Sequence, residues 1–271
     1  MSVAFPGFVL GQRTYLMGIL NLTPDSFSDG GRFNTPEAAL ARVVQLVEEG
    51  ADIIDIGGES TRPKSHLVST AEELLRVIPV IEQLREALPN TVLSIDTTKP
   101  IVAEEALKRG VHILNDVHGL HGEGEALAAL TAKYDAGLVI MHNSRLRPID
   151  GDPIESMRAY FEDALSIADR AGVSKSKIIL DPGIGFGKEV DENWALLRRL
   201  KELKQMGLPL LLGASRKKFL GEGLDIDNPD DRDMATVGTT VVGIEQGIDI
   251  VRVHDVKSNR DAALVADRTY R

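Results

Sequence analysis

The sequence repeats one unit eight times: a short run of apolar, mostly β-branched residues, followed by a longer amphipathic stretch. The short runs are apolar on both faces, which is typical of parallel strands buried between other layers. Eight such units, with no linker between them, predict a single α/β domain, a (β/α)8 TIM barrel over residues 1–271. An open doubly wound sheet is the alternative. The candidate strands are Tyr15–Leu20, Asp52–Ile56, Val92–Ile95, Val111–Leu114, Gly137–Met141, Lys177–Leu180, Pro209–Leu212 and Ile248–Val253.

Several of the longer stretches carry the start and stop signals of helices. Thr35 precedes an apolar stripe that ends at Gly50, and Ser69 with Glu72 has the spacing of a capping box. Pro79 falls inside the second stripe. It predicts a kink or an earlier end of that helix, because proline removes a backbone donor. A third stripe consists of Leu196, Leu197, Leu200 and Leu203.

Composition excludes several classes of protein. The chain has no cysteine, which excludes disulfides, thiolate zinc sites and a cysteine nucleophile, and favours a reducing compartment. Its net charge of -10 argues against broad nucleic-acid binding, which requires a basic face. No apolar run is long enough to cross a bilayer, and Met1–Gly11 lacks the features of a signal peptide. We therefore expect a cytoplasmic protein with no nucleic-acid or membrane partner.

Polar side chains follow the predicted strands, at the end where each strand stops. In a TIM barrel these positions line the mouth that holds the active site. A charge at the end of a buried strand loses its water, which is costly unless the charge is paired or meets a ligand. One such residue is usually structural, whereas a complete ring of them indicates a binding site. The ring comprises Asn21, Asp55, Asp96, Asn115, His142, Asp181, Lys217, Arg252 and His254.

The polar residues of the mouth are of two chemical types. Asp96, Asn115 and Asp181 offer acceptors and an amide, which suit a flat heterocycle with ring N–H and amino groups. The second type consists of the cationic residues Arg62, Lys217, Arg252 and His254. They suit an anion, because arginine can bind phosphate oxygens with two hydrogen bonds. The sequence has neither the order of a serine–histidine–aspartate triad nor a metal-ligand spacing, so we expect chemistry by positioning and charge.

Two segments, Asn21–Gly31 and Asp55–Pro63, closely resemble the signature segments of the bacterial dihydropteroate synthase family. Further segments match that family in its order along the chain: Ser94–Thr97, Asn115–Val117, Asp181–Lys188, Ser215–Lys217 and Arg252–Asp255. The resemblance covers essentially the whole chain and implies a pterin-binding transferase of folate biosynthesis. Members condense 6-hydroxymethyl-7,8-dihydropterin pyrophosphate with 4-aminobenzoate, giving 7,8-dihydropteroate and pyrophosphate.

The resemblance also implies roles for individual residues. Those implied to bind the pterin are Asp96, Asn115, Asp181 and Lys217. Those implied to bind pyrophosphate are Asn21, Thr61, Arg62, Arg252 and His254, with Mg²⁺ on Asn21. The 4-aminobenzoate would lie against Pro63, Phe186 and Lys217, and the implied catalytic set is Asp29, Asp96, Lys217, Arg252 and His254. Because such barrels are commonly dimers, a homodimer is implied, and the small-residue stretch Ala235–Gly247 offers it a close-packing surface.

Two positions depart from the pattern of the family. Many members have a serine after the residue that corresponds to Lys217, whereas this chain has Lys218. A lysine there can contact the benzoate carboxylate or point to solvent, and the sequence leaves both open. The second loop reads Lys64-Ser65-His66 where small residues are more common, which leaves its closed shape open.

The residues also permit alternative interpretations. Asp96 and Asp181 could each cap a helix, and His254 could be a paired histidine on the rim. A methyltransferase with a similar pterin barrel is a second candidate function, although it would not need Lys217 and Arg252 for pyrophosphate. A pterin-binding paralogue without activity and a phosphate-binding barrel isomerase are further candidates, because fold alone does not fix function.

Overall fold

The computed structural model describes residues 8–9, 11–23, 35–60 and 67–271. The strands are β1 (Tyr15–Asn21), β2 (Ile53–Gly57), β3 (Val92–Asp96), β4 (Ile113–Asp116), β5 (Gly137–Met141), β6 (Ile178–Asp181), β7 (Leu211–Leu212) and β8 (Ile250–Val253). The helices are α1 (Pro36–Glu49), α2 (Thr70–Ala87), α3 (Pro100–Lys108), α4 (Gly124–Lys133), α5 (Pro153–Arg170), α6 (Val190–Lys204), α7 (Lys218–Leu224), α8 (Asp233–Glu245) and α9 (Val256–Tyr270). Short 3-10 helices span Lys175–Lys177 and Pro229–Arg232.

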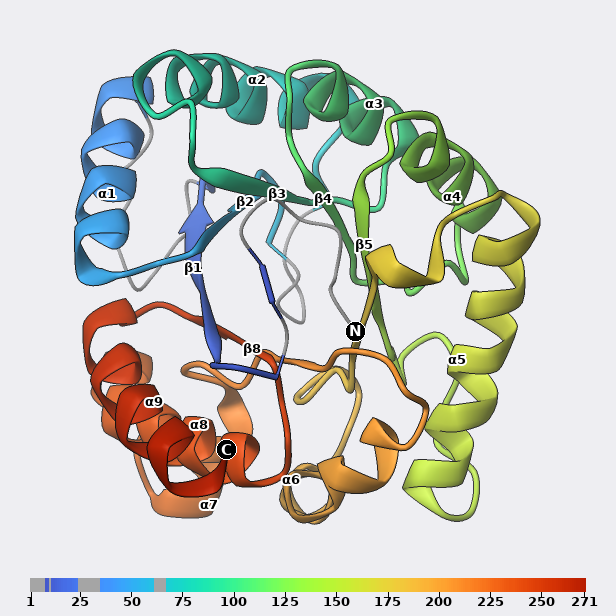
Figure 1. Cartoon of the computed structure of the whole chain (residues 1–271), viewed down its shortest axis with the longest axis vertical. Coiled ribbons are helices and arrows are strands. Elements are labelled where there is room, and N and C mark those ends of the chain that lie inside the picture. The colour runs from blue at the N-terminus through green and yellow to red at the C-terminus, as the bar shows by residue number, and fades with distance from the viewer. Residues whose placement is uncertain (1–7, 10, 24–34, 61–66) are drawn as a thin grey trace.

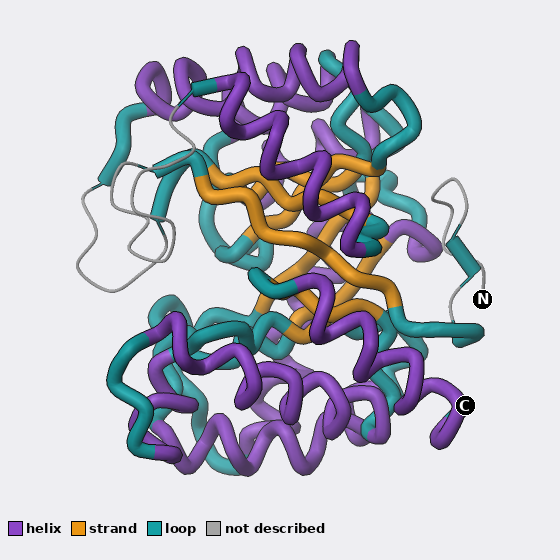
Figure 2. Tube along the Cα trace, turned by 90° about the vertical axis from the view of Figure 1, so that its left-hand side faces the viewer, coloured by secondary structure: helices purple, strands orange, loops and turns teal. Residues whose placement is uncertain are grey.

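The strands of the described chain form one parallel sheet that closes almost completely into a barrel. Neighbours pair in chain order from β1 to β6, and β1 also pairs with β8, which pairs with β7. A parallel bridge between Leu180 and Leu210 joins β6 to β7. The helices surround the barrel (Figure 1), and a side view shows strands crossing the centre between helices (Figure 2). The predicted TIM barrel is confirmed, and the open doubly wound sheet is wrong, because the strand order runs around the barrel with helices outside it.

The predicted strands are correct in number and order, but several were expected to end too early. Asn21, Asp96 and Asp181 are the last residues of β1, β3 and β6, whereas the apolar runs stop one residue before them. The difference arises because apolarity marks buried side chains, whereas a strand ends where its backbone ladder stops. The polar side chains at the mouth are therefore held by the sheet itself.

The helix signals lie where the sequence predicts them. The Thr35 side chain accepts a hydrogen bond from the amide of Ala38, and Gly50 ends α1 with a φ of 105°. The Ser69 side chain accepts from the amide of Glu72 at the start of α2. Among the described helices, none is long and apolar enough to cross a membrane.

Pro79 lies inside α2, which continues past it to Ala87. The prediction of an earlier end to this helix is therefore wrong. Val77, Ile81 and Leu84 are fully buried against the barrel. Packing of this face outweighs the loss of one backbone hydrogen bond.

Two apolar cores lie on the two sides of the barrel wall. The larger lies between the strands and the helices. The smaller lies inside the barrel and contains Phe8, Tyr15, Met17, Ile53, Val92, Ile113, Val139, Ile179, Leu211 and Ile250. Side chains alternate along a strand, so the next inward position lies two residues further on. At that level Asp55, Asn115, Asp181 and Arg252 replace apolar residues, and the interior becomes polar toward the mouth.

His142 follows β5, and its ring is fully buried. The ring centroid lies 4.7 Å from that of Tyr160 and 6.3 Å from that of Phe161. Neither ring nitrogen has a hydrogen-bond partner among the described residues. Burial, reinforced by the positive charge of Lys188, lowers the pKa of His142 to about 3. The folded protein therefore keeps this histidine neutral.

We expect His142→Leu to remove a pH-dependent loss of stability. Because the pKa of His142 is depressed in the folded state, only the unfolded chain gains a proton as the pH falls below 6.5. This uptake favours unfolding by about 1.4 kcal/mol per pH unit. When the pH is lowered from 7.5 to about 4.5, the free energy of unfolding should fall by about 2–3 kcal/mol more in the unmodified protein than in the variant. Urea unfolding at each pH measures this difference. At pH 7.5 the ring is neutral in both states, which provides the control; equal acid losses in both proteins would contradict the prediction.

Candidate active site

The C-terminal ends of β1 to β4 bring three polar side chains to one level of the barrel. In the parallel ladders Asn21 is opposite Gly57, and Gly57 is opposite Asp96. Asp96 is in turn opposite Asn115. A Cβ atom at Gly57 would lie 3.7 Å from Asn21 Oδ1 and 3.8 Å from Asp96 Cβ. The glycine therefore leaves space between an amide and a carboxylate.

Arg252 links two carboxylates inside the mouth. Its Nε donates to Asp55 Oδ2 at 2.6 Å, and its Nη2 donates to Asp96 Oδ2 at 2.9 Å. Asn115 Nδ2 donates to the same Asp55 oxygen at 3.1 Å. Asp55 is fully buried and Asp96 is 9% exposed, so bulk water does little to solvate either charge. The guanidinium compensates both of them.

A second polar group converges around Gly213, which follows β7. A Cβ atom at this glycine would lie 3.6 Å from Asp181 Oδ2, 3.9 Å from Lys217 Nζ and 4.0 Å from Arg252 Cβ. Arg252 thus belongs to both groups. The structure therefore brings together in one mouth the predicted residues Asp96, Asn115, Asp181, Lys217 and Arg252.

Neither aspartate of the mouth caps a helix. The residue before α3 is Lys99, and the residue before α6 is Glu189. Asp181 instead accepts a hydrogen bond from the amide of Gly183 at 2.7 Å, which fixes the turn after β6. The helix-cap interpretation of Asp96 and Asp181 is therefore wrong.

The Lys217 side chain reaches the loop that follows β6. Its Nζ donates to the backbone oxygen of Ile184 and lies 4.5 Å from the centroid of the Phe186 ring. The guanidinium of Arg145 lies 5.3 Å from the same centroid. Phe186 therefore provides an aromatic wall beside two cations, an arrangement that suits a flat anionic ligand.

Burial shifts the pKa values of three side chains in the mouth toward pH 7. It raises the pKa of Asp96 to about 7, against the opposing charge of Arg252. Burial also raises the pKa of Asp181, and it lowers the pKa of Lys217 to about 8. Perturbed groups that face one another across a polar space are typical of sites that bind and transform ligands.

His254 and Asn21 border the open side of the mouth. The Nδ1 of His254 is 2.9 Å from Ser215 Oγ, and Arg42 donates to its backbone oxygen at 3.0 Å. Asn21 is partly exposed at the end of β1. The other predicted site residues, Asp29, Thr61, Arg62 and Pro63, and the loop Lys64-Ser65-His66, lie outside the described residues.

Asp55 is the residue whose importance the sequence analysis missed. The sequence placed it in the ring without a role, yet it accepts hydrogen bonds from both Arg252 and Asn115. A signal was available, because Asp55 lies two residues from Ile53 and two from Gly57 along β2, so it shares their inward face. A carboxylate at an inward position of a buried strand requires a cation.

Lys218, which replaces the serine of many relatives, is directed to solvent. Its side chain is 80% exposed and forms an ion pair with Glu222, one turn further along α7. The structure therefore favours the solvent-facing alternative.

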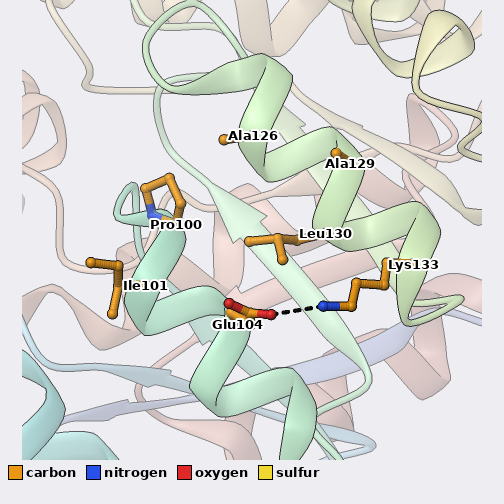
Figure 3. Close-up of a pocket in the computed structure, with 7 residues that line it drawn as sticks. All are labelled: Pro100, Ile101, Glu104, Ala126, Ala129, Leu130 and Lys133. Atoms are coloured by element: carbon orange, nitrogen blue, oxygen red, sulfur yellow. Dashed lines mark hydrogen bonds and ion pairs between the residues drawn. The ribbon is translucent and has the colours of Figure 1, made fainter.

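Two grooves on the surface are lined by residues other than the paired charges of the mouth. One, of about 450 Å³, borders the start of α3 and includes Lys99 and His118. The other, of about 310 Å³, lies between α3 and α4 (Figure 3), where Lys133 donates to Glu104 at 2.8 Å. Its remaining lining residues are Pro100, Ile101, Ala126, Ala129 and Leu130. Because the buried charges gather in the mouth, we take the mouth as the candidate active site.

Known proteins resemble this chain over almost its whole length. Residues 17–254 match the family model described as pterin binding enzyme. A dihydropteroate synthase from Synechocystis is 47% identical, over 97% of this chain and 93% of its own. The crystal structure of dihydropteroate synthase from Clostridium difficile in the presence of pteroic acid is 52% identical with a TM-score of 0.92, covering 97% of this chain and 99% of that chain. The Xanthomonas albilineans dihydropteroate synthase with 4-aminobenzoic acid is 40% identical with a TM-score of 0.88, covering 95% and 93% of the two chains.

The matched region, residues 17–254, runs from β1 through β8 and contains every described residue of the mouth. The three relatives described above all carry the name dihydropteroate synthase, and the two solved structures share the barrel. The chain therefore belongs to the pterin-binding enzyme family and, within it, to the dihydropteroate synthases, which are transferases.

Proposed function

We propose that the mouth of this barrel joins 6-hydroxymethyl-7,8-dihydropterin pyrophosphate to 4-aminobenzoate, giving 7,8-dihydropteroate and pyrophosphate. The observation that carries this proposal is the double pairing of Arg252 with Asp55 and Asp96, beside Asp181 and Lys217. Buried acceptors and cations in one space match both the donors of a pterin ring and the charge of a pyrophosphate.

The pterin would be recognised by Asp96, Asn115, Asp181 and Lys217. Gly57 and Gly213 leave the space for a flat ring between the two polar groups of the mouth. Asp181 and Asp96 would accept hydrogen bonds from the amino and ring N–H groups. A ligand without these donors would leave the buried acceptors without a hydrogen bond, and their desolvation would then not be compensated. The site would therefore discriminate against such a ligand.

The reaction exchanges one bond at the pterin methylene for another. The carbon–oxygen bond to pyrophosphate breaks, and its electron pair leaves with the oxygen. The amino nitrogen of 4-aminobenzoate forms the new bond to carbon and loses one proton. Growing charge on the leaving oxygen would be stabilised by Arg252 and His254, and positive charge on the carbon by Asp96. The residues proposed to complete this set from outside the described ranges are Asp29, Thr61 and Arg62.

The 4-aminobenzoate would lie against Phe186 and Lys217, and we propose that Pro63, outside the described residues, also contacts it. The aromatic ring of Phe186 offers a flat apolar face, and Lys217 Nζ lies 4.5 Å from its centroid. The benzoate carboxylate would be attracted by Lys217 and Arg145. The Xanthomonas structure with 4-aminobenzoic acid supports this choice of second substrate.

We propose Mg²⁺ as the cofactor, held by Asn21. One amide oxygen at the mouth fits this ion, which keeps several waters and is bound largely through the phosphates of its substrate. In the described ranges, no group of three His, Asp or Glu side chains offers an all-protein metal site. When bound, the ion would neutralise charge on the pyrophosphate.

We also propose that residues 1–271 act as one cytoplasmic domain and that two copies form a homodimer. The pairing of β1 with β8 joins the two ends of the barrel in one unit. On α8, Met234 is 72% exposed and Val242 is 42% exposed, and a Cβ atom at Gly238 would meet nothing within 4 Å. These residues lie four apart and so share one face, where a small central residue permits close packing of a second helix.

The reaction should require both substrates. Pyrophosphate release, followed with a coupled phosphate assay, should occur only with the pterin pyrophosphate and 4-aminobenzoate together, and chromatography should show dihydropteroate in equal amount. Removal of Mg²⁺ with a chelator should lower the rate at least about tenfold, because charge on the leaving group is then less well compensated. Pyrophosphate release without dihydropteroate would contradict the proposed function.

Asp181→Ala should mainly weaken pterin binding, whereas Arg252→Ala should mainly lower kcat. Asp181→Ala removes a charged acceptor and should weaken pterin binding about 10- to 100-fold, measured by calorimetry. Arg252→Ala leaves Asp55 and Asp96 unpaired and removes a cation, so it should lower kcat about 100-fold. Equal, small effects of the two substitutions would argue against this division of roles.

Asp249→Asn is the matched control for these two variants. Asp249 is a buried carboxylate (2% exposed) that pairs with Lys204 at the opposite end of β8 from the mouth. Its substitution should lower the melting temperature and leave both pterin affinity and kcat within about twofold of the unmodified protein.

Val242→Glu should convert the proposed dimer into a monomer. The added carboxylate would lie on the exposed face of α8, so it would lose its water in a packed interface and cost several kcal/mol, on the order of 3. Sedimentation velocity over a range of concentrations measures the result. Glu48→Gln on α1 is the control, because it changes one charge on a different face. A monomer in the unmodified protein at working concentration would refute the dimer itself.

A further inference from the structure

Arg216 follows β7 in an unusual backbone conformation. Its φ is 57°, in the left-handed region that residues with a side chain rarely adopt. It stands directly before Lys217, which has an extended conformation at the start of α7. Such a conformation persists only where the surrounding structure holds it, and it is common at functional sites.

Residues 230–236 contact Arg216 through its backbone and through its side chain. Its amide donates to Thr236 Oγ1 at 3.1 Å. Its guanidinium donates twice to Asp233, from Nε at 2.7 Å and from Nη2 at 2.8 Å. Its Nη1 donates to Asp230 at 2.8 Å. The two hydrogen bonds to Asp233 are the bidentate arrangement that fixes both distance and orientation.

A second arginine, Arg232, binds the backbone oxygen of Arg216. Arg232 is buried (8% exposed), and its Nη1 donates to the backbone oxygen of Arg216 at 3.1 Å. Its remaining donors reach the backbone oxygens of Ile226 and Asp227. A Cβ atom at Gly221 would lie 2.5 Å from Arg232 Nη2, so a larger residue of α7 at this position would displace the guanidinium. The amide, the carbonyl and the side chain of Arg216 are therefore all bonded to the same segment.

Arg216 and Lys217 are adjacent in one turn, and their side chains extend in different directions. The contacts of Arg216 therefore also fix the backbone from which the Lys217 side chain extends. Arg216 reaches Asp233 at the start of α8, whereas Lys217 reaches Ile184 O and the Phe186 ring across the mouth. The approach is close, since a Cβ atom at Gly185 would lie 2.9 Å from Lys217 Cδ. A rotation of the turn at Arg216 would withdraw the Lys217 Nζ from this contact.

We propose that Arg216 is a positioning residue: its ion pair with Asp233 holds a strained turn that places Lys217 in the active site. The proposal rests on the proposed function of the mouth, and it gives α8 a part in the geometry of the site. Arg216 itself need not touch a ligand. A displacement of Lys217 by about 1 Å would be enough to lower the rate up to about 100-fold.

A comparison of alanine and glycine at position 216 tests this. Arg216→Ala removes the ion pair but keeps a side chain that disfavours positive φ, whereas Arg216→Gly removes the ion pair and the strain together. We expect kcat/KM for 4-aminobenzoate to fall about 10- to 100-fold in the alanine variant and clearly less in the glycine variant. Unchanged activity in both variants, or equal losses in both, would overturn the proposal.

A second measurement does not depend on turnover. In the folded protein, burial lowers the pKa of Lys217 to about 8, and the charged groups that act on it include Asp181, Arg252, Asp96, Arg145 and Lys188. If the turn relaxes, Lys217 gains solvent and its pKa rises toward the ordinary value. NMR titration of ¹³C-labelled lysine, with the Lys217 signal assigned through Lys217→Arg, should show this rise in Arg216→Ala. An unchanged pKa would overturn the proposal, whereas an inactive unmodified protein would refute only the proposed function.

Two further variants complete the test: one for the case that the alanine variant does not fold, and one as a control. Asp233→Asn keeps the shape of the partner and removes its charge, so it should shift the Lys217 pKa in the same direction if the alanine variant does not fold. Arg199→Ala is the matched control, because Arg199 also pairs with two acidic residues, Asp152 and Glu202, but on the outside of α6. It should leave the rate and the Lys217 pKa unchanged. A rate loss in Arg199→Ala equal to that in Arg216→Ala would overturn the specific role of Arg216.

Discussion

The pairing of Arg252 with Asp55 and Asp96 is the interaction on which the mouth depends. The interior of a TIM barrel is packed with side chains, so each polar group inside it must find its partner there. A buried carboxylate without a nearby cation has a raised pKa, so it tends to be protonated and neutral. One guanidinium that compensates two of them allows a polar layer to lie directly above an apolar core. The layer can then meet a ligand with its charges already arranged.

Glycines at two inward positions leave space for a ligand. Gly57 and Gly213 stand at inward positions of the wall, and each faces a different polar group. Between them the barrel offers hydrogen-bonding groups from several strands. The same strands that bury the core thus leave a flat opening at their ends, and the rigidity of the sheet fixes its dimensions.

The barrel and the polar ring at its mouth could be predicted because the signals for both are local in the sequence. Burial on both faces shows in the composition of each strand, and the polar residue that ends a strand follows it directly. The inward position of Asp55 could be predicted from the alternation along β2, but its partner Arg252 could not, because it lies 197 residues away. The support of Arg216 by residues 230–236 and the tolerance of Pro79 in α2 likewise depend on tertiary packing, which no local pattern records.

The position of Arg252 on β8, the last strand of the barrel, has a consequence for the protein during its synthesis. The carboxylates that it compensates lie on β2 and β3, which leave the ribosome long before it does. Until β8 is made, β1 has an open edge and the polar layer lacks its counter-charge. The complete mouth therefore depends on the strand that is made last, because β8 supplies both the pairing edge of β1 and the counter-charge of the polar layer.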